Sequence, residues 1–336
     1  LEEKVRVRYR IDGALYEKMV YDNSLLPAIA TRIKIMGGMD ISEKRKPQDG
    51  RMSIEVDRQE YDIRISSIPT VHGEKLVLRL SSKLNLTRSK KELGLSDAEM
   101  GIFDHMLAHP YGIIFVTGPT GSGKSTTLAC VIDHINQTRH EHIITLEDPL
   151  EFLHRHNKSI VSQREISVDT VSYVTALRAS LRQSPDVILL GEMRDFETIQ
   201  VAMTAAETGH LIFSTLHTIG AANTIDRIID VFPPNQQRQI SVQLSMVLQA
   251  VISQQLVPTI DGHQVPAFEI MTVTPAIRNM IRDNKIPQID GMIYSSATPE
   301  LVSMDASLLK LYKDGTISKD TALTYATNPE MLKRRL

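Results

Sequence analysis

The segment from Gly118 to Ser125, which reads Gly-Pro-Thr-Gly-Ser-Gly-Lys-Ser, constrains the fold more than any other part of this chain. It fits the pattern G-x-x-x-x-G-K-[ST], follows the apolar run 112–117 and precedes the helix-compatible run 126–132. In this order a strand delivers the loop, glycines turn backbone N–H groups toward an anion, and the next helix directs its positive end at the same charge. A glycine-rich surface turn is the alternative, but the strand, loop and helix in register favour a phosphate-binding loop (P-loop) for a nucleoside triphosphate.

The residues of this loop have separate expected roles. We expect Lys124 to reach the β- and γ-phosphates and the Ser125 hydroxyl to bind Mg²⁺. The predicted nucleotide-binding residues of the loop are Gly118, Thr120, Gly121, Ser122, Gly123, Lys124, Ser125 and Thr126. A loop of this kind indicates binding, whereas hydrolysis also needs an acid near the γ-phosphate.

Length and composition limit the class of protein. A chain of 336 residues is long enough for two domains, and 42% apolar with 23% charged residues is ordinary for a soluble globular protein. No apolar run approaches the roughly 20 residues of a membrane-spanning helix. A net charge of −2 argues against a protein whose main task is to bind nucleic-acid phosphates. The single cysteine, Cys130, excludes an internal disulfide and a thiolate zinc cluster, which fits a reducing cytoplasm.

The first 80 residues predict a small α+β domain. Strand-like segments alternate with turn signals, and residues 25–36 have the apolar spacing of one amphipathic helix. The predicted strands are 5–11, 51–56, 61–65 and 75–80. Because the chain starts without Met, we expect this domain to be truncated at its start. Residues 81–94 are polar and poorly periodic, so they predict an interdomain linker.

Residues 95–336 predict an α/β domain with a helical C-terminal part. A capping-box spacing begins at Ser96. Predicted strands at 113–116, 143–146, 187–190 and 211–214 alternate with helical segments, which is typical of a parallel sheet covered by helices. After Val257 the chain is expected to be mainly helical, with helices at 275–282 and 304–313.

Polar residues follow three of these predicted strands. Glu192 ends the run 185–192, the acids Glu147, Asp148 and Glu151 follow the strand at 143–146, and His217 follows the strand at 211–214. Ligands of parallel α/β sheets lie at the carboxyl ends of the strands. Each residue alone is compatible with a solvated carboxylate or a structural histidine. Together with the P-loop they predict one catalytic edge, with Glu192 polarising a water and an imidazole near the γ-phosphate.

These segments resemble the ATPases that drive type IV pili and type II secretion, and within them the PilT-type retraction motors. Four segments carry the resemblance, which extends over nearly the whole chain: the Walker A segment Thr117–Leu128, the acidic segment Glu147–Phe152, the Walker B segment Gly191–Asp195, and the histidine segment from Gly209 to His217. The resemblance implies a RecA-like P-loop NTPase domain preceded by a PAS-like domain, with ATP and Mg²⁺ as ligands. It also implies a homohexameric ring in which nucleotide binding closes one domain on the other.

The resemblance also implies roles for individual residues. Glu192 matches the catalytic glutamate and Glu151 the acid near the metal, so Ser125, Glu151 and Glu192 are the expected metal-binding residues. His217 is expected to act in catalysis and His210 in nucleotide binding. The first domains of these motors supply arginines that stabilise the transferred phosphate, and the candidates are Arg51 and Arg64.

The direction of the motor is less constrained by the sequence. Residues 276–282, Ala-Ile-Arg-Asn-Met-Ile-Arg, resemble a segment of retraction motors, and one cysteine cannot form the four-cysteine zinc insertion of assembly motors. Residues 62–79 are more similar to the first domain of assembly and secretion ATPases. We therefore expect a retraction motor for twitching motility, with an assembly or secretion ATPase as the alternative and a nucleic-acid translocase as a weaker one. The resemblance implies a PilC-like platform protein as partner, no nucleic acid, and a cytoplasmic position at the inner membrane, peripheral to it and not inserted.

Overall fold

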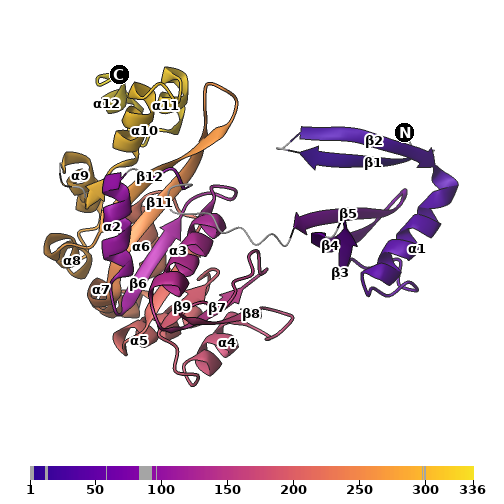
Figure 1. Ribbon diagram of the computed structural model, residues 1–336, viewed down its shortest axis with the longest axis horizontal. Helices are drawn as coiled ribbons and strands as arrows, with labels where there is room; N and C mark the ends of the chain where they lie inside the picture. The colour runs from indigo at the N-terminus through magenta and orange to yellow at the C-terminus, as the bar shows by residue number, and fades with distance from the viewer. Residues whose placement is uncertain are drawn as a thin grey trace. The chain divides into compact units, whose positions relative to one another are not determined.

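The structure is a computed structural model that describes residues 4–11, 14–57, 59–82, 93–95, 97–296, 298 and 300–336. It divides between Leu84 and Asn85 into two units, each of which is described by itself (Figure 1). Most of the predicted linker, and Ser96 of the predicted capping box, lie outside the described residues. Leu93, which the sequence placed in the linker, is buried in the core of the second unit together with Leu95. The domain boundaries given above otherwise stay a prediction.

The first unit contains a β-hairpin, one helix and a separate three-stranded sheet. Its elements are β1 (Lys4–Ile11), β2 (Ala14–Asp22), a 3₁₀ turn (Asn23–Leu25), α1 (Leu26–Met36), β3 (Gln48–Val56), β4 (Gln59–Thr70) and β5 (Gly73–Ser82). All strand pairs are antiparallel, in the orders β1-β2 and β3-β4-β5. Met39, Ile63 and Ile65 form its small core, with Ile33 of α1 packed against them. The α+β prediction agrees with these elements, although β2 was missed.

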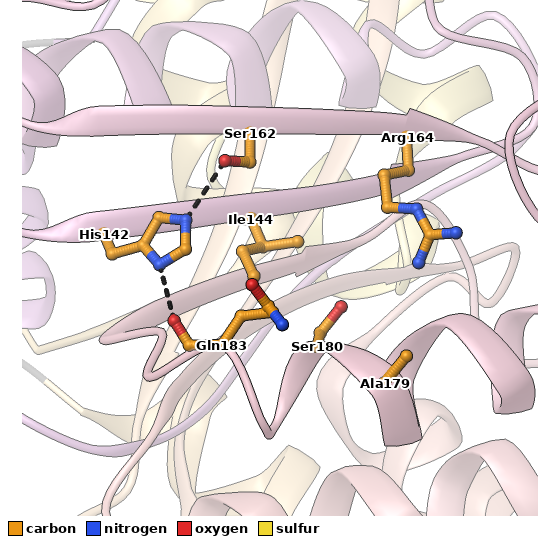
Figure 2. A pocket seen from close by; sticks show the side chains of 7 residues that line it. All are labelled: His142, Ile144, Ser162, Arg164, Ala179, Ser180 and Gln183. Atoms are coloured by element: carbon orange, nitrogen blue, oxygen red, sulfur yellow. Dashed lines mark hydrogen bonds between the residues drawn. The ribbon is translucent and has the colours of Figure 1, made fainter.

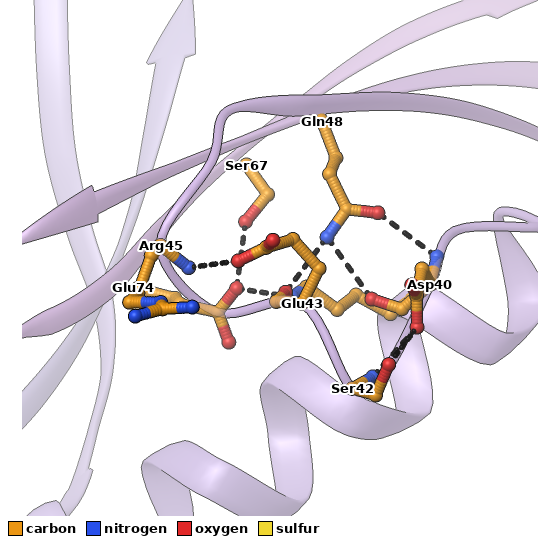
Figure 3. A network of polar contacts seen from close by, with 8 residues as sticks. Asp40, Ser42, Glu43, Arg45, Gln48, Ser67 and Glu74 are labelled. Carbon is orange, nitrogen blue, oxygen red and sulfur yellow. Dashed lines mark hydrogen bonds and ion pairs between the residues drawn. The ribbon is translucent and has the colours of Figure 1, made fainter.

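A buried lysine ties α1 to the sheet and to the loop before β3. Lys34 is only 1% exposed, pairs with the carboxylate of Glu74 on β5, and donates from Nζ to the carbonyl oxygen of Glu43 at 2.7 Å. Gln48 holds the same loop, because its Nε2 donates to the carbonyl oxygens of Asp40 and Glu43 and its Oε1 accepts from the Asp40 N–H (Figure 3). One lysine side chain therefore connects helix, strand and loop, through an ion pair and a hydrogen bond.

We expect Lys34→Met to destabilise the first unit by about 3 kcal/mol, because it leaves the Glu74 carboxylate, 14% exposed, without its cation. Amide hydrogen exchange of β3–β5 in the full chain measures this loss as exchange about 100-fold faster. The double variant Lys34→Met, Glu74→Gln removes both charges and is expected to recover most of the protection. Wild-type exchange rates in the single variant would contradict the stabilising role of this pair.

The second unit is built on one eight-stranded sheet. Its strands are β6 (Gly112–Thr117), β7 (His142–Glu147), β8 (Ile160–Glu165), β9 (Val187–Leu190), β10 (Leu211–Leu216), β11 (Leu248–Pro258), β12 (Gln264–Thr272) and β13 (Leu301–Val302). Their order is β13-β12-β11-β6-β10-β9-β7-β8. All neighbouring strands from β11 to β8 are parallel, whereas β12 and β13 are added antiparallel. The sheet thus has the parallel centre that the sequence predicted.

Helices cover both faces of this sheet (Figure 1). On one face α2 (Asp97–Leu107) and α3 (Lys124–Thr138) pack through residues such as Phe103 and Ile132. The other face is packed by α4 (Tyr173–Ser180), α5 (Phe196–Glu207), α6 (Ala221–Asp230), α7 (Pro234–Val247), α8 (Pro275–Arg282) and α9 (Pro287–Ser295). The C-terminal helices α10 (Met304–Lys313), α11 (Lys319–Tyr325) and α12 (Pro329–Lys333) pack with Val257 of β11 and Ala267 of β12. The α/β fold class is confirmed.

Four strands of the second unit were not predicted. The four predicted strands and the helices at 275–282 and 304–313 are present, but β8 and β11 were missed, and the region after Val257 contains β12 and β13 as well as helices. Pro266 and Glu269 interrupt the apolar pattern of β12. Pairing with β11 along nine residue pairs, rather than local pattern, makes this segment a strand.

Candidate functional site

The carboxyl ends of four neighbouring parallel strands form the candidate site. The P-loop follows β6, His217 follows β10, Glu192 follows β9 and the acidic segment begins at the end of β7. Backbone hydrogen bonds continue beyond the strands, from Gly118 N to Leu216 O at 3.3 Å and from Gly191 N to Leu146 O at 2.8 Å. The ends are therefore held side by side, as the sequence predicted.

The glycines at the two ends of the P-loop are required by both conformation and space. Gly118 has φ 138° and Gly123 has φ 89°, which are left-handed values that favour glycine. A Cβ on Gly118 would lie 2.1 Å from the carbonyl oxygen of Gln254, and one on Gly123 would lie 2.8 Å from Nε2 of the same residue. Gly123 is the N-cap of α3, so the helix begins directly at the loop. The loop is thus a preformed bend at a helix N-terminus, the arrangement that binds phosphate.

Lys124 is buried inside this bend. Its Nζ donates to the carbonyl oxygens of Gly118 at 2.7 Å and Pro119 at 2.9 Å. Burial lowers the pKa of Lys124, whereas the charges of Glu151 and Glu192 act to raise it. Both carboxylates therefore lie near enough to the P-loop to influence its cation. We expect phosphate oxygens to replace the carbonyl partners of Nζ when nucleotide binds.

Glu192 lies beside the cationic side chain of Arg194 and the imidazole of His217. Its Oε2 lies 2.6 Å from Nε of Arg194 and 3.7 Å from Nε2 of His217, and its side chain is 17% exposed. Asp195, which follows in the sequence, instead caps α5 by accepting from the N–H and hydroxyl of Thr198. The structure thus brings together the acid and the histidine that the sequence nominated, and assigns Asp195 to helix capping.

The acidic segment contributes two carboxylates of different character. Burial raises the pKa of Glu147 to about 7, and its Oε1 is buried with no hydrogen-bond partner among the described residues. Glu151 is exposed, and its negative charge acts on Lys124.

Tyr173, the first residue of α4, also reaches this edge, since a Cβ on Gly191 would lie 2.8 Å from its hydroxyl. Burial and the charge of Glu192 raise the pKa of Tyr173. No motif marks Tyr173 in the sequence.

The residues nominated for Mg²⁺ fit a hard cation. Ser125 offers a hydroxyl in the first turn of α3, and Glu151 and Glu192 offer carboxylates whose charges both reach Lys124. The part of the chain that the structure describes contains no cluster of three His, Cys, Asp or Glu side chains that could hold a metal by itself. This donor set suits Mg²⁺, which protein sites commonly hold through one or two side chains together with water and substrate phosphates.

His210 does not reach the P-loop within the second unit. It precedes β10, and its Nδ1 contacts the carbonyl oxygen of Ala205 at 2.8 Å, while its own carbonyl accepts from the N–H of Gly112 at the start of β6. Because β6 and β10 are parallel, His210 lies at the amino edge of the sheet, opposite the phosphates, at a distance of about 20 Å for six strand residues. The geometry of this unit alone therefore does not bring His210 to the P-loop, and its role in nucleotide binding stays a prediction. The histidine segment supplies one site residue, His217.

The candidate arginines lie in the first unit. Arg51 on β3 and Arg64 on β4 are directly paired across the sheet, and Nε of Arg51 lies 2.6 Å from Oδ1 of the buried Asp62. This arrangement holds the Arg51 guanidinium against the sheet surface. A contact of either arginine with phosphate stays a prediction.

A cavity of about 290 Å³ lies away from the catalytic edge, between α4 and the sheet. Its lining includes His142 and Ser162 from the amino-terminal halves of β7 and β8, together with Arg164 and Gln183 (Figure 2). The two ring nitrogens of His142 contact the Gln183 carbonyl oxygen and the Ser162 hydroxyl, at 3.0 and 3.1 Å. No P-loop residue lines this cavity.

A parallel sheet with a P-loop, a strand-end glutamate and a nearby histidine at one edge defines a P-loop nucleotide hydrolase of RecA-like architecture. Residues 1–320 match the family described as Type II/IV secretion system protein. The chain belongs to this family.

Individual relatives are consistent with this assignment. The type IV pilus retraction ATPase PilT of Pseudomonas aeruginosa is 46% identical over 267 residues, which cover 80% of this chain and 76% of that protein. The type II secretion system protein E of Aeromonas hydrophila is 42% identical over 263 residues, 77% of this chain and 50% of that protein. A crystal structure of the pilus retraction motor PilT with bound ADP superimposes with a TM-score of 0.79 at 39% identity, covering 97% of this chain and 92% of that one.

Proposed function

We propose that this chain is an ATP hydrolase that powers the retraction of type IV pili and thereby twitching motility. The observation that carries the hydrolytic part is the position of Glu192, 3.7 Å from His217 and close enough to influence Lys124. Retraction is supported by 46% identity with a PilT protein over 80% of this chain and 76% of that protein. The secretion ATPase matches at lower identity and over only half of its length.

Each residue at the edge has a role in this proposal. Lys124 and the P-loop N–H groups hold the β- and γ-phosphates of ATP, and Glu192 orients the attacking water and accepts its proton. His217 donates to the γ-phosphate, so that its position reports whether that group is present. Mg²⁺, when bound through Ser125 and the nearby carboxylates, neutralises phosphate charge.

The motor is proposed to act as a homohexamer. Arg51 and Arg64 stabilise the transferred phosphate, and hydrolysis releases the closure between domains that nucleotide binding produces. A PilC-like platform protein in the inner membrane is the proposed partner, and the cytoplasmic face of that membrane is the proposed location. Among the described residues, no helix has the length and apolar character needed to cross a bilayer. A peripheral position of the motor at that membrane is part of the same proposal.

Deletion of the gene separates retraction from assembly. We expect the deleted cells to carry excess pili and to lose twitching, because assembly continues without withdrawal. Electron microscopy of surface pili and a twitching-zone assay measure the two effects. Complementation with the wild-type gene is the control. Bald cells would instead identify an assembly ATPase, which the similarity of residues 62–79 to those motors keeps as the second candidate.

A further inference from the structure

Two adjacent residues of strand β11, Ser253 and Gln254, make hydrogen bonds to two different segments near the catalytic edge. Ser253 is 0% exposed and Gln254 is 3% exposed, and side chains that are adjacent on a strand point to opposite faces. In the register of β11 with β6, Ser253 pairs with Thr117, the residue just before the P-loop. Both side chains therefore lie beside the point where β6 becomes the P-loop.

Gln254 supports the P-loop at three places. Its Oε1 accepts from the Thr127 hydroxyl at 2.7 Å in the buried first turns of α3. Its carbonyl oxygen and Nε2 occupy the spaces that a Cβ on Gly118 and on Gly123 would need. One side chain and its backbone thus contact both bends of the loop and the helix that follows.

Ser253 holds the segment that carries His217. After leaving β10, this segment reaches the N-terminus of α6, where Gly220 N donates to Ser253 Oγ at 3.0 Å. The next N–H, of Ala221, donates to Oε1 of Glu269 at 2.8 Å, and Glu269 is the direct cross-strand neighbour of Ser253. Since β6 lies between β10 and β11, the segment must cross the end of β6, where the P-loop begins.

We propose that Ser253, Gln254 and Glu269 are positioning residues that set the separation between His217 and the P-loop. The inference rests on the proposed ATP hydrolysis. The His217 segment is attached to β10 at one end and to the Ser253–Glu269 pair at the other. Loss of either acceptor leaves an N–H at the start of α6 unpaired, and the segment shifts to find another partner. A shift of about 1 Å at a catalytic group lowers turnover by up to about 100-fold.

Substitutions on the two faces of β11 are expected to change different kinetic constants. Ser253→Ala is expected to lower kcat for ATP about tenfold with KM within about twofold, because it displaces His217 and spares the P-loop. Gln254→Leu is expected to raise KM and the dissociation constant for ADP about tenfold with a smaller effect on kcat. Gln254→Glu retains the acceptor for Thr127 and is expected to recover part of the affinity.

Neighbouring residues of the same type provide matched controls. The buried Ser307 accepts from the N–H of Phe268 on β12 at 3.2 Å but belongs to α10, so Ser307→Ala is expected to leave kcat unchanged. Gln255 donates to the carbonyl oxygen of Tyr325 in α11, so Gln255→Leu is the control for Gln254. Equal losses in a variant and its control would overturn the inference.

A conservative substitution and a double variant complete the test. Glu269→Gln keeps an oxygen acceptor for Ala221 and is expected to retain most of kcat, whereas Glu269→Leu loses it. Ser253→Ala in a His217→Ala background is expected to have no further effect, because Ser253 acts through His217. A further tenfold loss in that background, or an unchanged kcat for Ser253→Ala, would overturn the inference. Absence of ATP turnover in the wild-type chain would instead overturn the proposed function on which it rests.

Discussion

The variant Glu192→Gln is expected to lower kcat for ATP hydrolysis by roughly 1,000-fold while leaving nucleotide affinity nearly unchanged. An amide cannot accept the proton of the attacking water, although it has almost the same shape as the carboxylate. In the structure the Glu192 carboxylate lies 2.6 Å from Nε of Arg194 and 3.7 Å from Nε2 of His217, so its charge orients both. Steady-state phosphate release, together with fluorescent-nucleotide binding, separates the two effects.

Controls for this variant distinguish chemistry from folding. Glu207→Gln changes an exposed carboxylate at the end of α5, the helix that follows Glu192, and is expected to keep wild-type turnover. Gel filtration of Glu192→Gln is expected to give the same assembly as wild type. Turnover within tenfold of wild type would remove Glu192 from the catalytic role.

The second large effect is expected for Lys124→Ala, which should abolish measurable ATP binding as well as turnover. Lys124 is the buried cation of the P-loop, and its Nζ already lies against the carbonyl oxygens of Gly118 and Pro119. Without it, the negative charges of Glu151 and Glu192 remain beside the phosphate position and repel the nucleotide. Isothermal titration with ATP and Mg²⁺ measures the loss.

A lysine far from the P-loop is the matched control. Lys285 is exposed between α8 and α9, so Lys285→Ala is expected to bind ATP as wild type does. The Glu192 and Lys124 variants together separate nucleotide binding from hydrolysis. Glu192→Gln retains binding and loses turnover, whereas Lys124→Ala loses both. If Lys124→Ala still bound ATP with wild-type affinity, the P-loop would not be the phosphate site.

The parts of the site that depend on residues close together in the chain could be predicted from the sequence. The P-loop was predicted because left-handed glycines, a buried strand and a helix start are all local requirements. Glu192 and His217 were predicted because each follows a short apolar strand. Their convergence then needed only the rule that parallel strands share a carboxyl edge.

The structure adds most to the sequence analysis where the sequence does not determine strand direction or strand pairing. His210 and His217 belong to one motif, but they bracket β10 and so lie at opposite edges of the sheet. The strand β12 lacks a clear pattern and exists because β11 pairs with it. Tyr173 reaches Gly191 from another element, and nothing in its neighbouring residues indicates this contact.

The sequence by itself determined the phosphate loop, the α/β class and the acids and histidine at the strand ends, because these depend on backbone requirements and apolar patterns that extend over a few residues. Only the tertiary structure decided what supports them. Gln254 meets Thr127 across 127 residues, and Glu269 meets Ala221 across 48. Strand order and register bring these distant residues together. The residues next to them in the chain therefore give no sign of such contacts.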